Sequence, residues 1–221
     1  IPIDEDHCPR DIELEKVIQK YKDQTDSKYC RVVTRFADRY THPARNQETL
    51  LGKLLADAFK DVLGVDIMFL GSGSIRDEEL GPIVQYRDLL QVFPYNDEIY
   101  RICVTGEQLR RMVKRILRNE GDHAEYYQFS RGFRIEFNQK EQELISLSFN
   151  GYEVRDNDQY KLGLQSFHLK NIQDFLDVSL EEVTAIKRPK IISTKSTDVL
   201  EEYFSQYELI RVSNEQRLIL R

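Results

Sequence analysis

The sequence has no long hydrophobic run, and this absence bounds the kind of protein it encodes. No apolar stretch within its 221 residues reaches the roughly 18 residues that a membrane-spanning helix needs. Residues 1–6 lack the basic start and apolar middle of a signal peptide, and they are typical of a cut made inside a longer protein. We therefore expect a fragment without a membrane span, and its compartment stays open.

Cysteine is scarce, and the few cysteines form no recognisable pattern. The number of cysteines is odd, with Cys8, Cys30 and Cys103, and no C-x-x-C motif occurs. A disulfide framework is therefore not expected. One bridge between Cys8 and Cys30 and three unpaired thiols are the open alternatives, of which we favour three unpaired thiols.

Positively charged residues are fewer than negatively charged ones. The chain has 32 Lys and Arg against 38 Asp and Glu, for a formal net charge of −6. A general nucleic-acid binder needs a broad basic face, so we expect no nucleic-acid partner. The basic segment 110–118 could be such a patch or the solvated face of a helix, and the acidic total favours the helix face. A local pocket of two or three arginines is compatible with this charge.

Catalytic and metal-binding motifs are absent as well. The four histidines, His7, His42, His123 and His168, are scattered, and none has a partner at metal-ligand spacing. Neither a G-x-S-x-G motif nor a P-loop occurs. We therefore predict no catalytic residue, no metal site and no cofactor in this chain.

Helical and strand patterns alternate irregularly along the chain. Apolar residues at helical spacing predict helices over residues 11–24, 47–63, 84–92, 106–119 and 197–207. Apolar and β-branched runs predict strands over residues 29–36, 65–70, 98–104, 126–137, 144–149 and 160–167, with a hairpin turn at Asn150-Gly151. Because there is no regular βαβ alternation, the fold class is expected to be α+β.

The most informative segment is the small-residue turn Gly71-Ser72-Gly73-Ser74, which follows the apolar run 65–70 and ends at Arg76. Such a turn leaves backbone N–H groups uncovered for an anion, and Arg76 adds a forked cation. About twenty residues on, Tyr95 follows a proline and can stack on a flat ring. Together they indicate a nucleotide-sized ligand. A plain strand-exit turn and core packing around Tyr95 are the alternatives.

Five segments, in order, match the motifs of one family. Residues 45–58 resemble R-x-x-E-x-x-x-G-N-L-x-x-D-A, residues 71–76 resemble N-G-G-G-I-R, and residues 89–95 resemble a segment ending in V-x-P-F. Residues 104–109 resemble L-x-G-x-x-L, and residues 215–218 resemble an E-G-R-I tail. Over essentially its whole length the chain resembles the C-terminal substrate-binding domain of the 5′-nucleotidase family, which includes UDP-sugar hydrolases and 2′,3′-cyclic phosphodiesterases.

The resemblance implies a layered α/β/β/α sandwich and two parts of the chain. Residues 1–27 would be the end of a preceding phosphoesterase domain with its linker helix, and residues 28–221 the substrate-binding domain. The family's N-terminal domain holds two divalent metal ions and the catalytic residues, so that domain of the same chain is the implied partner. The parent would be a metal-dependent nucleotide phosphomonoesterase, whereas this chain alone would hydrolyse nothing. Many members are extracellular, periplasmic or at the cell surface, and the cytoplasm stays open.

The resemblance also carries over a nucleotide site, residue by residue. Arg45 and Arg76 match the arginines that hold phosphate and ribose, and Tyr95 and Phe167 match the two aromatic walls around the base. The implied substrate-binding residues are Arg45, Ser72, Gly73, Arg76, Tyr95, Phe167 and Asp174. The base and the phosphate linkage are left open by these matches.

Two positions depart from the family pattern. Gly71 stands where the family has Asn, which removes one side-chain hydrogen bond. Residues 170–175 align with the glycine-rich N-G-G-D-G-F loop, whose ribose-binding Asp falls on Gln173, or on Asp174 with a one-residue slip. These departures motivate a second hypothesis, a non-catalytic scaffold or interaction domain with a decayed nucleotide pocket. Under that hypothesis Phe167 would serve ordinary strand packing.

Overall fold

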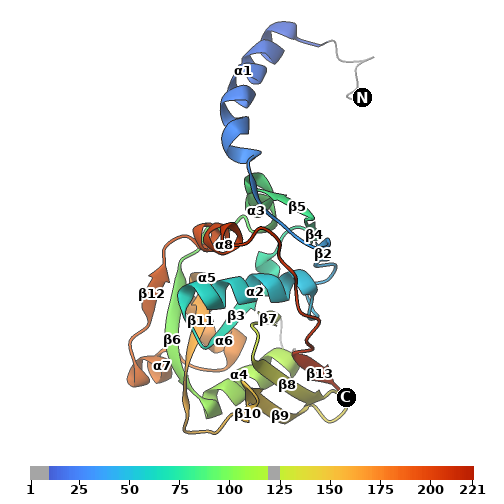
Figure 1. Cartoon of the computed structure of the whole chain (residues 1–221). Coiled ribbons are helices and arrows are strands. Elements are labelled where there is room, and N and C mark those ends of the chain that lie inside the picture. The colour runs from blue at the N-terminus through green and yellow to red at the C-terminus, as the bar shows by residue number, and fades with distance from the viewer. Residues whose placement is uncertain (1–9, 119–124) are drawn as a thin grey trace, which may run out of the picture.

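The structure is a computed structural model that describes residues 10–118 and 125–221. Figure 1 shows a body of sheets and helices from which the N-terminal helix projects. The helices, in chain order, are α1 (Ile12–Tyr29), α2 (Leu50–Leu63), α3 (Tyr86–Val92), α4 (Gly106–Arg118), α5 (Ser166–Lys170), α6 (Ile172–Leu176), α7 (Leu180–Ile186) and α8 (Ser196–Ser205). No described helix has the length and apolar character that crossing a bilayer requires.

A mixed five-stranded sheet forms the centre of the body. Its strands, in spatial order, are β12 (Lys190–Ser193), β6 (Ile99–Thr105), β11 (Gln159–Gln165), β3 (Ile67–Gly71) and β7 (Tyr127–Phe129). Strand β11 runs antiparallel to β6 and parallel to β3. The mixed sheet confirms the expected α+β class.

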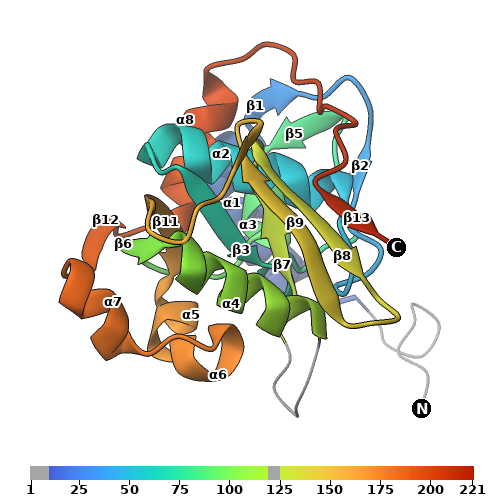
Figure 2. The ribbon, with the colours of Figure 1, turned by 90° about the horizontal axis from the view of Figure 1, so that it is seen from below.

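Strand β3 is buried on both faces of this sheet. Ile67 and Phe69 belong to one hydrophobic core, and Met68 and Leu70 belong to the other. This explains why residues 67–70 form a continuous apolar run instead of an alternating one. Helices α2, α3 and α8 pack in the core of Met68 and Leu70, whereas α4, α6 and a second sheet pack in the core of Ile67 and Phe69 (Figure 2). The layered arrangement of helices and sheets expected from the resemblance is confirmed.

Helix α2 begins and ends as its sequence predicts. The side chain of Thr49 accepts a hydrogen bond from the Gly52 N–H at 3.0 Å and caps the first turn. Gly64 ends the helix with a φ of 61°, a conformation that glycine adopts without strain. The Thr49 N–H donates a hydrogen bond to Oε1 of Gln128 at 3.1 Å, which holds the start of α2 at the edge strand β7 (Tyr127–Phe129) of the five-stranded sheet.

The predicted strand 126–137 is wrong, because the chain forms two strands in different sheets. Strand β7 ends at Phe129, and a turn at Gly132, with a φ of 83°, starts β8 (Phe133–Asn138). The second sheet has the spatial order β10 (Tyr152–Glu153), β9 (Glu143–Phe149), β8 and β13 (Leu218–Leu220). The hairpin turn at Asn150-Gly151 is confirmed by the pairing of Tyr152 with Phe149.

The predicted strand 160–167 is too long by two residues. Strand β11 ends at Gln165, and Phe167 lies in the first turn of α5. Helices α5, α6 and α7 follow, and no helix was predicted there. Helices α5 and α6 have five residues each, too few to show helical periodicity. One signal existed, since Ser179 and Glu182 form the capping box of α7.

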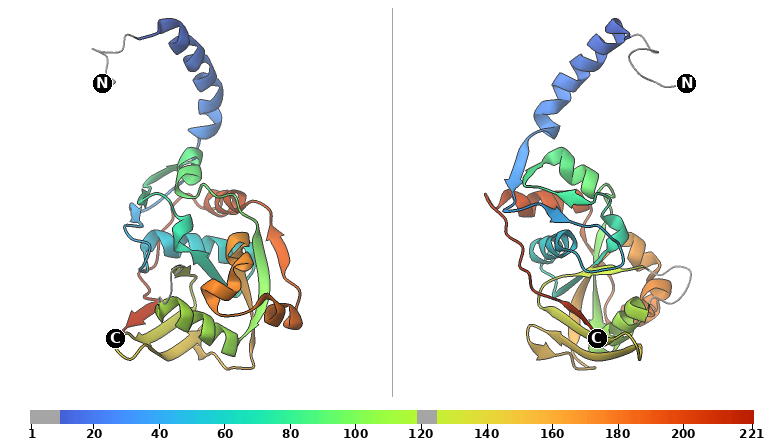
Figure 3. Two further views of the ribbon diagram at one scale, coloured as in Figure 1. Left: turned by 180° about the vertical axis from the view of Figure 1, so that it is seen from behind. Right: turned by 90° about the vertical axis from the view of Figure 1, so that its right-hand side faces the viewer.

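The predicted N-terminal helix exists and extends to Tyr29 instead of Gln24. None of its residues is buried, and Leu14, Val17, Ile18 and Tyr21 are each more than half exposed. Figure 3 shows that α1 leaves the body next to α3, where the rings of Tyr29 and Tyr86 stack with their centroids 6.0 Å apart. The bridge considered between Cys8 and Cys30 lies outside the described residues, and Cys103 is a free thiol.

Two short antiparallel pairs complete the fold beside α3 and α2. Strand β1 (Val32–Arg35) pairs with β5 (Ile83–Gln85). Strand β2 (Tyr40–Thr41) pairs with β4 (Glu79–Leu80). The β2–β4 pair matters for the site, because the segments that carry Arg45 and Arg76 adjoin it.

Candidate nucleotide site

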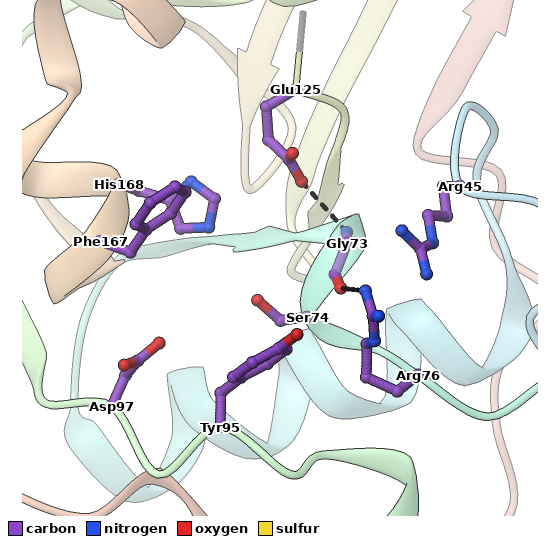
Figure 4. Close-up of a pocket in the computed structure, with 9 residues that line it drawn as sticks. All are labelled: Arg45, Gly73, Ser74, Arg76, Tyr95, Asp97, Glu125, Phe167 and His168. Carbon is purple, nitrogen blue, oxygen red and sulfur yellow. Dashed lines mark hydrogen bonds between the residues drawn. The ribbon is translucent and has the colours of Figure 1, made fainter. Parts of the chain in front are cut away.

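A pocket of about 370 Å³ lies at the ends of β3 and β11. The segments that line it are far apart in the sequence, and Figure 4 shows their side chains around one space. The lining residues are Arg45, Gly73, Ser74, Arg76, Tyr95, Asp97, Glu125, Phe167 and His168. A nucleoside monophosphate is of a size that such a cavity can take.

The small-residue turn after β3 forms the floor of the pocket as a single 3₁₀ turn, η1 (Ser72–Ser74). The Gly73 N–H donates a hydrogen bond to Oε1 of Glu125 at 3.0 Å, so a carboxylate occupies the amide that an anion was expected to use. Burial raises the pKa of Glu125, because the charged carboxylate loses contact with water. The Gly73 amide therefore faces a protein carboxylate and is not free for phosphate.

The two arginines lie on one side of the pocket and are both exposed. Arg76 donates from Nη1 to the Gly73 carbonyl at 3.4 Å, and its guanidinium lies 5.7 Å from the ring centroid of Tyr95. Among the described residues, neither Arg45 nor Arg76 forms an ion pair with a carboxylate. Their charges are therefore available to an anionic ligand.

The two aromatic side chains face the pocket from different elements. Tyr95 is 45% exposed, and the Ser196 hydroxyl at the start of α8 donates to its carbonyl at 2.8 Å. Phe167 is 53% exposed, and its ring packs edge-on against the ring of His168. Large apolar rings left this exposed at a cavity are a surface on which a flat base can stack.

His168 explains the glycine that departs from the family pattern. A Cβ atom on Gly71 would lie 2.1 Å from Nε2 of His168, so the imidazole fills the space that a side chain at position 71 would need. The ring is held by a 2.9 Å hydrogen bond between its Nδ1 and the hydroxyl of Tyr127. Burial lowers the pKa of His168 to about 4, so the ring is neutral at physiological pH. Gly71 and His168 thus form a matched pair.

Gln165 connects the turn to the opposite wall of the pocket. Its side-chain oxygen accepts hydrogen bonds from the Gly71 N–H at 3.3 Å and the Ser74 hydroxyl at 3.1 Å. Its side-chain amide reaches Oδ2 of Asp97 at 3.5 Å. The residue before Asp97, Asn96, accepts from the Thr197 hydroxyl at 3.0 Å. These contacts fix Asp97 in the pocket wall.

The structure brings five of the seven predicted site residues together and leaves two apart. Arg45, Gly73, Arg76, Tyr95 and Phe167 all line the pocket. Ser72 does not line it, because its side chain is fully buried and accepts a hydrogen bond from Gln128. Asp174 lies in α6 and lines a different cavity, where its carbonyl accepts hydrogen bonds from Arg115.

Sequence reasoning missed Ser74, Asp97, Glu125 and His168. The local sequence could have indicated Ser74 and Asp97, since Ser74 belongs to the small-residue turn and Asp97 follows Tyr95 by two residues. Glu125 and His168 carry no local signal, because only the pairing of β7 with β3 and the start of α5 bring them to the pocket.

A second arginine site lies away from the pocket. Arg217 is 1% exposed, and its Nη2 donates to Oδ2 of Asp57 at 2.6 Å. Its Nη1 donates to the carbonyl of Phe129 at 2.6 Å, and its backbone N–H donates to Glu48 at 3.2 Å. Burial raises the pKa of Glu48, whose carboxylate lies near Lys53 and Arg217. These residues tie the C-terminal tail to α2.

Comparison with known proteins gives relatives of the same kind. A 5′-nucleotidase of Vibrio parahaemolyticus is 23% identical over 172 residues, which cover 76% of this chain and 29% of the relative. Protein UshA of Escherichia coli is 24% identical over 121 residues, which cover 55% of this chain and 22% of the relative. The chain thus spans less than a third of the length of these relatives.

The fold is shared with a solved structure. The crystal structure of a 5′-nucleotidase precursor from Thermus thermophilus matches 96% of this chain and 44% of its own chain, with a TM-score of 0.74 at 15% sequence identity. The sequence model of the family described as 5′-nucleotidase, C-terminal domain, matches residues 25–178, more than half of the chain. The chain therefore belongs to the 5′-nucleotidase family through its C-terminal domain.

Proposed function

We propose that this chain binds a nucleotide in the pocket at the ends of β3 and β11 and serves as the substrate-binding domain of a larger phosphohydrolase. The observation that carries the proposal is the meeting of two exposed arginines and two exposed aromatic rings in one cavity of about 370 Å³. The family membership supports it. Neither Ser72 nor Asp174 belongs to the proposed binding set, because neither lines this cavity.

Phosphate binding falls to Arg45 and Arg76. Both guanidinium groups are exposed and lie on the same side of the pocket in Figure 4. A phosphate between them would receive charge-assisted hydrogen bonds from planar, forked donors. The contact of Arg76 with the Gly73 carbonyl leaves its other guanidinium N–H groups for the ligand.

Base binding falls to Tyr95 and Phe167. Both residues line the cavity and are about half exposed, so an unfilled pocket leaves apolar area in water. Stacking of a base on one aromatic ring contributes about 1–3 kcal/mol, and two walls would hold it on both faces. The anchoring of Tyr95 by Ser196 and of Phe167 by the α5 turn keeps both walls in place without the ligand.

The catalytic metal ions are assigned to a preceding phosphoesterase domain of the same chain. Within residues 10–118 and 125–221, no three His, Cys, Asp or Glu side chains come together as a metal site, so these residues do not fit the metal centre and receive no chemical step. Helix α1 would connect the two domains, which agrees with its exposed apolar residues. We expect no phosphate release from nucleotides by this chain with added Mg²⁺ or Mn²⁺.

The proposal is tested by titrating the chain with AMP, GMP, CMP and UMP in a calorimeter. We expect saturable binding of at least one nucleotide, which Phe167→Ala weakens by at least tenfold, about 1.4 kcal/mol. Tyr152→Ala is the matched control, because this tyrosine in β10 is 80% exposed and lies outside the pocket. Equal losses in both variants would contradict the aromatic clamp.

The same titration distinguishes the proposal from the scaffold hypothesis. A scaffold with a decayed pocket binds none of the four nucleotides up to millimolar concentration. In that case, substitutions at Arg45 and Arg76 in the full-length parent would leave both kcat and KM for the nucleotide unchanged. Binding that requires both arginines would exclude the scaffold.

A further inference from the structure

Asp97 lines the pocket and belongs neither to the phosphate contacts nor to the aromatic walls. It follows Tyr95 by two residues, and Figure 4 shows its carboxylate on the side of the pocket away from Arg45 and Arg76, pointing toward the space between the two aromatic rings. A phosphate at the arginines and a base between the rings would therefore place an edge of the base near Asp97.

The Asp97 carboxylate makes few contacts within the protein. Among the described residues, its Oδ2 accepts one long hydrogen bond of 3.5 Å from Gln165, and no cationic side chain pairs with it. Its backbone position is nevertheless firm, because Asn96 is held by Thr197 and Tyr95 by Ser196, both at the start of α8. A carboxylate that is fixed at a cavity and has unused acceptor sites can select a ligand by the hydrogen-bond donors that the ligand presents.

The chemistry of a carboxylate restricts which base edge it accepts. At neutral pH an aspartate side chain has two acceptor oxygens and no donor. Guanine presents two adjacent donors, N1–H and the N2 amine, and can satisfy both oxygens at once. Adenine presents one amine beside the N1 lone pair, and that lone pair would face a carboxylate oxygen without a proton between them. Cytosine has the same defect, and uracil offers a single N–H between two carbonyls.

We propose that Asp97 is the specificity-determining residue of this pocket and selects guanine nucleotides through the N1–H and N2 amine of the base. This inference rests on the proposed function, since it requires that a nucleotide binds here. Asp97 contacts the bound base and takes no part in phosphate chemistry.

The test compares the dissociation constants of GMP, IMP and AMP for the chain by calorimetry. We expect GMP to bind at least tenfold more tightly than AMP, in the range that one bidentate base contact gives. IMP, which has the N1–H but lacks the N2 amine, should fall between them. In Asp97→Asn, one acceptor becomes a donor, and the ratio of the AMP to the GMP constants should drop to threefold or less.

Glu98→Gln is the matched control, because Glu98 is the neighbouring carboxylate, accepts a hydrogen bond from the Tyr100 hydroxyl at 3.0 Å and does not line the pocket. We expect it to keep the wild-type ratio. A wild-type ratio within twofold of one, or an unchanged ratio in Asp97→Asn, would overturn the inference and leave nucleotide binding intact. If Asp97→Asn weakened the binding of GMP, IMP and AMP by the same factor, the inference would also be overturned. Asp97 would then contact the ribose, which all three nucleotides share. If only CMP or UMP binds, the inference fails and the proposed function stands; if no nucleotide binds, both fail together.

Discussion

Two arginine sites in this chain use the same residue type for different purposes. Arg217 is almost fully buried, and its guanidinium meets the Asp57 carboxylate and the carbonyl of Phe129. Arg45 and Arg76 are exposed at a pocket and have no carboxylate partner among the described residues. An arginine whose charge is neutralised inside the protein holds the fold, whereas one left unpaired at a cavity is available to a ligand.

The contrast also separates the roles within a single family motif. In the segment 45–58, Arg45 reaches the pocket, but Glu48 and Asp57 bind Arg217 of the C-terminal tail. The segment 45–58 and the C-terminal tail are therefore joined by buried polar contacts. A motif residue is a candidate for ligand binding only when its side chain reaches the pocket.

The largest expected effect is the loss of stability when the buried contact between Arg217 and Asp57 is removed. Arg217→Met leaves the Asp57 carboxylate buried without its cation, so the free energy of unfolding should fall by about 3–5 kcal/mol in urea denaturation. Arg217→Met with Asp57→Leu should recover part of this loss, because the uncompensated charge is gone. Arg76→Ala is the opposite case and should leave the urea midpoint unchanged. An equal loss from Arg217→Met and Arg76→Ala would erase the distinction between the sites.

The second prediction concerns the histidine beside the pocket. The pKa of His168 is lowered from 6.5 to about 4, so the unfolded chain binds this proton more readily than the folded chain between these values. The contribution of His168 to the free energy of unfolding should therefore fall by about 3 kcal/mol as the pH drops from about 6.5 to about 4. Glu48 and Glu125 have raised pKa values and act in the opposite direction. The difference between wild type and His168→Gln isolates the histidine, and parallel pH profiles would contradict its burial as a neutral ring.

A smaller effect tests the matched pair of Gly71 and His168. Gly71→Ala places a Cβ atom 2.1 Å from Nε2 of a ring that Tyr127 holds, and should cost about 1–3 kcal/mol of stability through overpacking. Because His168→Ala removes the obstacle, the double variant should be less destabilised than the sum of the two single variants. Additive losses in this cycle would mean that the two positions do not compete for the same space.

The sequence predicts the fold best where one element carries its own signal. Strand β3 and helix α2 fit this case. Residues 67–70 of β3 are apolar on both faces, and α2 has helical periodicity between Thr49 and Gly64. The short helices after β11 fail, because each is too short for periodicity and is stabilised by packing against the body. The predicted strand 126–137 was wrong for another reason, because the turn at Gly132 divides it between two sheets.

The site residues also differ in whether the local sequence indicates them. The turn, Arg76 and Tyr95 could be predicted from local sequence, whereas Arg45 and Phe167 came only from the resemblance to the family. Glu125 and His168 reach the pocket through tertiary pairing that no local pattern encodes. Asp174 was placed by alignment to a glycine-rich loop, and helix α6 instead carries it to a different cavity.

The most direct measurement is a crystal structure of this chain with a bound nucleoside monophosphate. The account predicts that the base lies between Tyr95 and Phe167, that the phosphate oxygens lie within hydrogen-bond distance of Arg45 and Arg76, and that Arg217 keeps its contact with Asp57. A nucleotide bound elsewhere on the chain, or in the pocket without contact to either exposed arginine, would contradict it.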